Sequence, residues 1–70
     1  MSQAEDESPV GKSAHVIEAI PGGDKAGEVL VRIRGGSEAY IAFSDQPIAV
    51  GDQVIVLADR GARMLLVAPL

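Results

Sequence analysis

Short aliphatic segments in which apolar and polar positions alternate, each closed by glycine or proline, constrain the fold of this chain more than any other feature. Residues 27–34, GEVLVRIR, show the pattern most clearly, because Val29, Val31 and Ile33 share one face while charged side chains take most of the other. Such alternation is typical of a strand with one buried face. No window longer than about ten residues shows helical spacing without glycine or proline. The pattern therefore predicts an all-β protein.

The alternating pattern recurs along the chain, and the connecting segments have the composition of turns. We expect strands over residues 10–20, 27–34, 37–44, 53–59 and 62–70. In the first strand the alternation slips near Val16 and Ile17, which indicates either a β-bulge or strong coiling of a long strand. The dipeptides Gly35-Gly36 and Arg60-Gly61 predict tight hairpin turns. The one place for a short helical turn is between residues 43 and 50.

With 70 residues the chain has room for one small domain. It contains no cysteine, so neither a disulfide framework nor a cysteine-based zinc site can support the fold, and the core has to be aliphatic. Closure into a barrel suits such a chain because it removes exposed strand edges. We therefore predict a five-stranded small β-barrel of the OB-fold type over residues 10–70, with an SH3-like barrel as the structural alternative.

The first nine residues, MSQAEDESP, differ in composition from the rest of the chain. They are polar and acidic and end at Pro9, so we expect a disordered acidic tail or linker over residues 1–9. They hold three of the ten acidic residues, which leaves seven acids against six bases in residues 10–70. This near-neutral balance argues against long-range attraction to nucleic-acid phosphates. The sequence shows neither a run of about 20 apolar residues nor a signal peptide, so we expect the chain as given to be soluble.

Residue types that perform catalysis or bind metals do not occur together here. His15 is the only histidine. Ser13 lies on the same face of its strand, but no nucleophile elbow or glycine-rich oxyanion segment accompanies the pair. Gly11-Lys12-Ser13 lacks the upstream glycine of a phosphate-binding loop. We therefore expect no enzymatic activity, no cofactor and no metal.

The remaining candidates for a functional role are surface residues that can contact a partner. The segments YIAF, at 40–43, and MLLV, at 64–67, are apolar on both faces, so one face of each requires cover from outside the core. A partner could provide this cover, and the alternative is that the first strand and the segment over residues 44–50 provide it. We predict an interaction surface that combines these apolar residues with arginines from the outer face of the second strand: Tyr40, Phe43, Leu66, Arg32 and Arg34.

A different class of function, binding of single-stranded nucleic acid, is the alternative. OB barrels bind single strands with stacked aromatic rings and a basic groove. Here the aromatics are Tyr40 and Phe43 alone, and the basic residues that could converge are four arginines: Arg32, Arg34, Arg60 and Arg63. Arginines that keep a β-sheet surface soluble explain the same pattern, so we regard nucleic acid as the less favoured partner.

The order of glycine, valine and proline residues resembles the soluble C-terminal domain of the NfeD-like family. The resemblance covers residues 10–70. Each matching element is weak evidence alone, but their order and spacing together are more specific for the family. The elements are Val10-Gly11, Ala14, Gly27-Glu28-Val29, Tyr40-Ile41-Ala42, Val50-Gly51-Asp52, Val54, Val56, Leu66-Val67 and Pro69. The loop over residues 20–27 departs from the family in being longer and more charged than its shortest versions.

This resemblance implies a five-stranded OB barrel that belongs to a membrane-anchored parent protein, with the membrane-spanning region absent from this sequence. It also implies that the domain itself is soluble and cytoplasmic. The expected role is a protein-interaction or scaffold module that works beside stomatin- or prohibitin-type membrane proteins. The serine protease domain of the family's long forms is absent from these 70 residues.

Overall fold

The computed structural model of the chain describes residues 7–70, which form five strands and no helix. The strands are β1 (Ser13–Glu18), β2 (Gly27–Ile33), β3 (Gly36–Phe43), β4 (Gln53–Gly61) and β5 (Met64–Pro69). The predicted all-β class is confirmed, and each expected strand is present with shifted ends. The helical turn considered between residues 43 and 50 does not form, because that segment pairs instead with the loop after β1.

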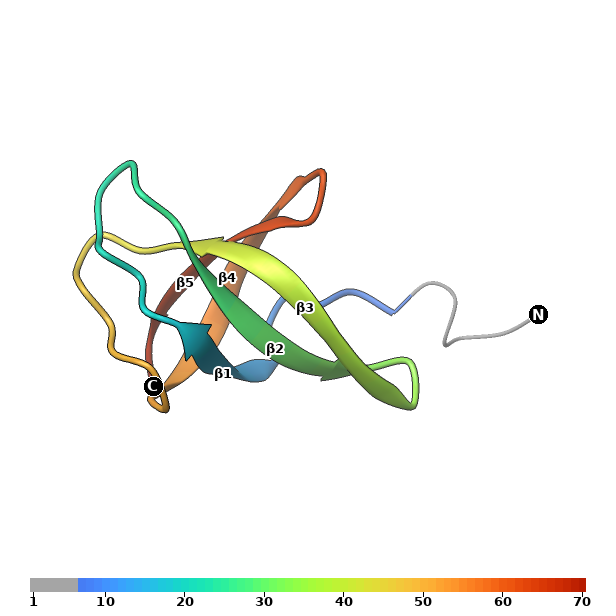
Figure 1. The fold of residues 1–70 in the computed structure, drawn as a ribbon. Coiled ribbons are helices and arrows are strands. Elements are labelled where there is room, and N and C mark those ends of the chain that lie inside the picture. Colours follow the sequence, from blue (N-terminus) through green and yellow to red (C-terminus); the bar gives the residue numbers. More distant parts are fainter. Residues whose placement is uncertain (1–6) are drawn as a thin grey trace.

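The five strands close into one barrel in the order β1-β2-β3-β5-β4. Neighbours pair antiparallel except β3 and β5, which run parallel, and β1 closes the barrel against β4. The predicted OB-type barrel is therefore confirmed over the SH3-like alternative. Figure 1 shows the β2–β3 and β4–β5 hairpins at the end where the N-terminal segment leaves the barrel, here called the hairpin end. The β1–β2 and β3–β4 loops and the C-terminus lie at the opposite, loop end.

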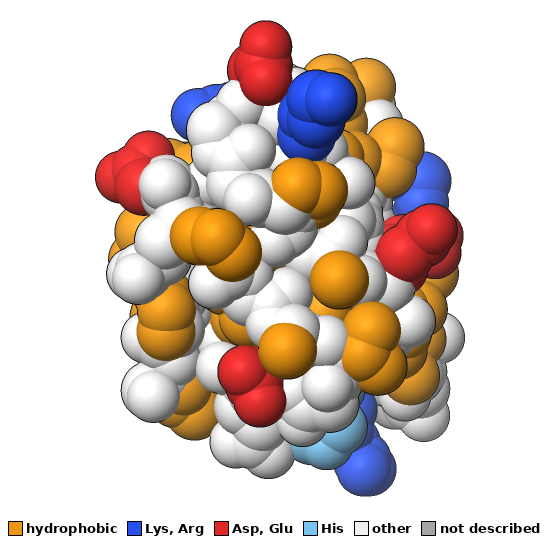
Figure 2. All heavy atoms as spheres, turned by 60° about the vertical axis from the view of Figure 1, so that its left-hand side comes forward, with side chains coloured by type: hydrophobic (Ala, Val, Ile, Leu, Met, Phe, Trp, Pro, Cys, Tyr) orange, Lys and Arg blue, Asp and Glu red, His pale blue; other side chains and the backbone are white. Residues whose placement is uncertain are grey.

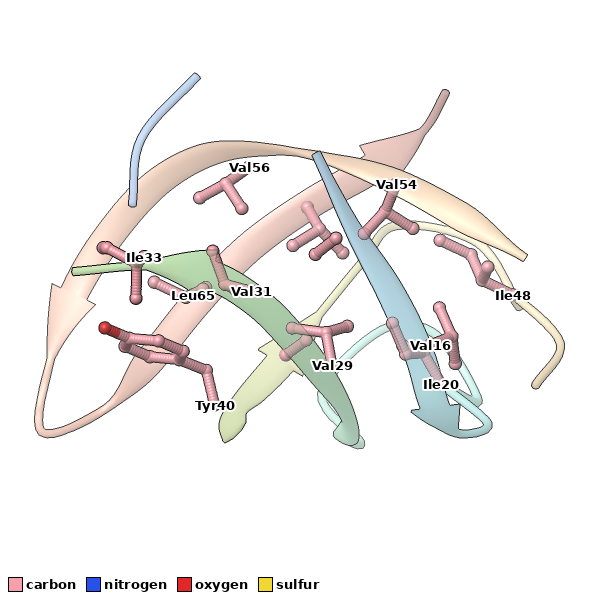
Figure 3. Packing of buried hydrophobic residues seen from close by; sticks show 13 residues of the cluster. Val16, Ile20, Val29, Val31, Ile33, Tyr40, Ile48, Val54, Val56 and Leu65 are labelled. Atoms are coloured by element: carbon pink, nitrogen blue, oxygen red, sulfur yellow. The ribbon is translucent and has the colours of Figure 1, made fainter. Parts of the chain in front are cut away.

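The core is aliphatic and is built by the inward-facing residues of every strand. In β2 the buried positions are Val29, Val31 and Ile33, as the alternation predicts. Figure 3 shows these side chains pointing toward Tyr40 of β3 and Leu65 of β5 in the barrel interior. The full set of buried hydrophobic residues is Ala14, Val16, Ile20, Val29, Val31, Ile33, Tyr40, Ala42, Ile48, Val54, Val56, Leu65 and Val67.

Of the two alternatives for the first strand, a β-bulge or strong coiling, the structure shows the β-bulge. The pairing of β1 with β2 shifts register between Val16 and Glu18, so Ile17 is the extra residue. The bulge lets Val16 stay buried while Ile17 turns outward, with 44% of its surface exposed. After the bulge the chain crosses the loop end, where Ile20 and Ile48 exchange two backbone hydrogen bonds of 2.9 Å. That bridge joins the two long loops.

Both hairpin turns lie one or two residues away from the dipeptides that predicted them. The first is formed by Arg34 (φ 55°) and Gly35 (φ 76°), and Gly36 is already part of β3. The prediction of a Gly35-Gly36 turn is wrong because burial of Ile33 sets the register, and Ile33 pairs directly with Gly36.

In the second hairpin, the expected Arg60-Gly61 turn is also wrong. The turn residues are Ala62 (φ 54°) and Arg63 (φ 59°), and Gly61 ends β4. Left-handed φ values are costly for residues with a side chain. Here the Arg63 side chain spans the hairpin end and donates a 2.6 Å hydrogen bond to the Ala39 carbonyl of β3. This contact contributes to holding the strained turn in place.

Of the expected tail, residues 1–6 lie outside the described part of the chain. Residues 7–9 lie against the hairpin end: Pro9 is buried. The Glu7 carboxylate accepts a 2.7 Å hydrogen bond from the Arg34 backbone N–H and forms a 2.8 Å ion pair with Lys12. The hairpin end therefore includes the segment that precedes β1.

Candidate interaction surface

An apolar surface covers the outside of the barrel where β3, β5 and β4 lie side by side. Phe43 pairs with Leu66 and Ile41 with Met64 across the parallel ladder, and Ile55 pairs with Ala68 across β4 and β5. Their neighbours in each strand are core residues, so these side chains point outward. We call this surface the apolar face: Ile41, Phe43, Ile55, Met64, Leu66 and Ala68.

Within the apolar face Ile41 is 41% exposed, and the other five residues are half-buried. The guanidinium of Arg60 lies 5.6 Å from the centroid of the Phe43 ring, a distance that permits a cation–π contact. The face therefore combines a contiguous apolar centre with a cation at its edge. This composition fits the centre and rim of a protein–protein interface.

Two of the residues predicted to contact a partner lie together on this face. Phe43 and Leu66 are direct neighbours in the β3–β5 ladder, although they are far apart in sequence. Sequence reasoning missed Ile55 on β4, and it named Ile41 and Met64 only as parts of two apolar runs. A signal was present, because Val54 and Val56 alternate with Ile55 and Leu57, which makes both faces of that strand apolar.

Tyr40 does not belong to this surface. Only 6% of its surface is exposed, and its ring lies in the core beside Ile33 and Leu65 (Figure 3). Its expected role as an interaction residue is therefore corrected. Tyr40 supports the hairpin end instead, because the Arg63 guanidinium lies 4.7 Å from its ring centroid.

The two arginines of the predicted surface are also placed elsewhere. Arg32 is exposed on β2, where it lines a depression of about 200 Å³ with His15, Leu30 and Ser37. Arg34 lies in the β2–β3 turn. Arg32 is separated from β5 by β3, and Arg34 lies just before the start of β3 whereas Phe43 ends that strand, so the structure does not bring the two arginines together with Phe43 and Leu66.

Three of the four arginines considered for nucleic-acid binding, Arg34, Arg60 and Arg63, contact other side chains of the protein. The Glu38 carboxylate lies 3.3 Å from the Arg34 guanidinium and 3.6 Å from that of Arg63, while Arg60 lies over Phe43. Hydrogen bonding with the Tyr40 side chain, and then the negative charge of Glu38, raise the pKa of Arg34 above its ordinary value. With Tyr40 buried, the described residues do not form an aromatic and basic groove of the kind that binds single strands.

Glu7 gives a pH-dependent signature of the hairpin end. The hydrogen bond from Lys12 and then that from the Arg34 backbone hold the pKa of Glu7 below its ordinary value of 4.5. A lowered pKa in the folded state means that the contact stabilises the fold above pH 4.5 and is lost as the pH falls through the folded value. In an NMR titration we expect the Glu7 carboxyl to titrate below 4.5 and to return toward it in Lys12→Gln. A Glu7 midpoint that Lys12→Gln leaves unchanged would contradict this contact.

His15 is exposed on β1, and Ser13 is exposed on the same strand. Within residues 7–70, no side-chain hydrogen bond joins His15 to a serine or a carboxylate. The described residues also contain no group of three or more histidine, aspartate or glutamate side chains arranged to hold a metal ion. None of them forms a helix with the length and apolar character needed to span a bilayer.

The fold and its surface define a small closed β-barrel domain with an apolar outer face. A family model described as the NfeD C-terminal domain matches residues 13–68. The chain therefore belongs to the NfeD C-terminal domain family, which confirms the resemblance seen in the sequence. Among curated proteins, no match is found.

Solved structures agree with this assignment. The soluble domain of the NfeD protein YuaF from Bacillus subtilis is 33% identical, with a TM-score of 0.76 over 93% of this chain and 77% of that chain. The soluble domain of a membrane protein implicated in regulation of membrane protease activity, from Corynebacterium glutamicum, is 26% identical. The match has a TM-score of 0.60 and covers 89% of this chain and 97% of that chain. The C-terminal domain of stomatin operon partner protein 1510-C from Pyrococcus horikoshii shares the fold at 24% identity. That match has a TM-score of 0.64 and covers 100% of this chain and 97% of that chain.

Proposed function

We propose that this domain is a non-catalytic protein-interaction module of a membrane-anchored parent protein, and that its apolar face binds a stomatin- or prohibitin-type membrane protein. The domain would lie on the cytoplasmic side of the membrane. The observation that carries the proposal is the apolar face itself, because strands of a small barrel usually alternate buried apolar residues with polar residues that face water. Here three adjacent strands carry apolar residues on the outside as well.

Names of the similar structures support the class of partner and the anchored parent. Two of those structures are soluble domains of proteins whose names describe an NfeD protein and a membrane protein, and a third is named a stomatin operon partner. The physical reason for binding is burial of the apolar face. A few well-packed anchors usually dominate such an interface, and Phe43 with its neighbour Leu66 has the size and central position of an anchor pair.

Binding can be tested with a purified stomatin-type protein in lipid nanodiscs, titrated with the 70-residue chain. We expect saturable binding, and we expect Ile41→Glu and Leu66→Gln each to weaken it about tenfold or more, which corresponds to loss of about 1.4 kcal/mol. The matched control is Leu30→Gln, because Leu30 is 36% exposed but lies on β2, outside the apolar face. Equal weakening by Leu30→Gln, or unchanged binding in both face variants, would disprove the role of this surface.

A further inference from the structure

A second surface lies at the loop end, beyond the edge of the apolar face that Ile55 and Ala68 form. There the segment over residues 47–53 and the end of β5 enclose a groove of about 310 Å³, lined by Pro47, Ile48, Asp52, Gln53, Pro69 and Leu70. Four of the six residues that line it are apolar, and Asp52 carries the only charged side chain among them. Figure 2, which brings the loop end forward, shows apolar side chains spread over this region with acidic side chains on several sides of them.

The backbone around Asp52 is fixed from several directions. The Val16 N–H donates to the Asp52 carbonyl at 2.9 Å, and the Gly51 N–H donates to the Val16 carbonyl at 2.8 Å. The Asp52 N–H closes a turn onto the Ala49 carbonyl at 3.2 Å, and Gly51 supplies the positive φ of 93° that a type II turn requires. The groove is therefore formed before any ligand arrives, which lowers the entropic cost of binding.

The Asp52 carboxylate itself is available to a ligand. Within residues 7–70 it takes part in no ion pair and no side-chain hydrogen bond. A lysine or arginine side chain places its aliphatic stem along apolar surface and its charged head against a carboxylate. Pro47, Pro69 and Leu70 provide the apolar surface for the stem, and Asp52 provides the carboxylate for the charged head.

Charge is divided between the two ends of the barrel in a way that favours a basic partner here. The half toward the loop end carries five acidic residues and one base: Glu18, Asp24, Glu28, Asp45, Asp52 and Lys25. The half toward the hairpin end carries five bases and three acids: Lys12, Arg32, Arg34, Arg60, Arg63, Glu7, Glu38 and Asp59. Counted over residues 7–70, the net charges of the two halves are −4 and +2. Complementary charge of this kind raises the rate of encounter with a basic partner and orients it.

We propose that the groove at the loop end binds a lysine or arginine side chain from a basic segment of a protein partner. The inference rests on the proposed function only in taking the partner to be a protein, since the groove shares no residue with the apolar face. One basic side chain of the partner contacts the Asp52 carboxylate, and the acidic half of the barrel attracts the basic residues that flank it.

A capped tri-arginine peptide is the probe, titrated into the isotope-labelled chain at low salt and followed by amide NMR shifts. We expect the largest shifts at residues 47–53 and 69–70, and a dissociation constant that rises at least fivefold in Asp52→Asn. Asp59→Asn is the matched control, because it removes the same charge at the hairpin end, and we expect less than a twofold change. A capped tri-glutamate peptide should produce no shifts in the groove.

Equal effects of Asp52→Asn and Asp59→Asn, or shifts spread over the acidic residues without a maximum at the groove, would overturn the proposal. The stomatin-type titration separates this outcome from failure of the proposed function. If Ile41→Glu abolishes binding of the stomatin-type protein while the peptide still binds the groove, both ideas stand as separate sites. If the peptide binds and the stomatin-type protein does not, the proposed stomatin-type partner is wrong, and the proposal that the groove binds a basic side chain stands.

Discussion

Val31→Asp is expected to leave the domain unfolded at 25 °C. Val31 lies in the middle of β2, and none of its surface is exposed. The substitution removes a buried valine, worth about 1.5–3 kcal/mol, and places a carboxyl group without a partner among aliphatic side chains, which costs roughly 2–7 kcal/mol. A domain of this size has a stability on the order of 5 kcal/mol. Loss of amide shift dispersion and of the β signal in circular dichroism would show the effect.

The control for that variant shows how the structure sharpens a choice made from sequence. From the alternating pattern, Arg34→Asp is the natural control, because Arg34 is expected on the outer face of the same strand. In the structure Arg34 lies in a turn beside Glu7 and Glu38, so an aspartate there would add a third carboxylate. Arg32→Asp is the better control. Arg32 is exposed and next to Val31, and we expect its replacement to change stability by less than about 1 kcal/mol.

The sequence predicts the barrel because burial in a small closed sheet leaves few alternatives. Val29, Val31 and Ile33 can reach a common core only in one phase of the strand, and the slip at Val16 and Ile17 shows where that phase changes. The positions of the turns are less predictable. Glycine marks a turn region to within one or two residues, because the register is set by core residues such as Ile33. In the second turn Arg63 has a left-handed φ, although a prediction from composition would place glycine at such a position.

The candidate site is predicted only in part, because a pattern in one strand does not state which strands are neighbours. Apolar residues on both faces of β3 and β5 identify Phe43 and Leu66, but only the parallel ladder places them side by side. Tyr40 illustrates the opposite error. An aromatic residue in a strand apolar on both faces gives no sign of which side it occupies, and here it faces the core.

Gly27→Ala is expected to cause the second large loss of stability. Gly27 begins β2 and is buried against the end of β1. A Cβ added there would overlap the carbonyl oxygens of Glu18 and Ala19. These are backbone atoms just after the β-bulge, so the methyl group fits only if β1 moves away from β2. We expect a loss of about 3 kcal/mol in the free energy of unfolding, measured by urea denaturation.

Gly36→Ala separates this steric effect from the general effect of replacing a strand glycine. Gly36 also lies at the start of a strand, but a Cβ at Gly36 would meet no atom within 4 Å. Its replacement should change stability by no more than about 0.5 kcal/mol, or raise it slightly by restricting the unfolded chain. Equal stability of the two variants would mean that β1 can leave β2 at little cost. The bulge at Ile17 would then be a flexible joint rather than a fixed part of the barrel wall.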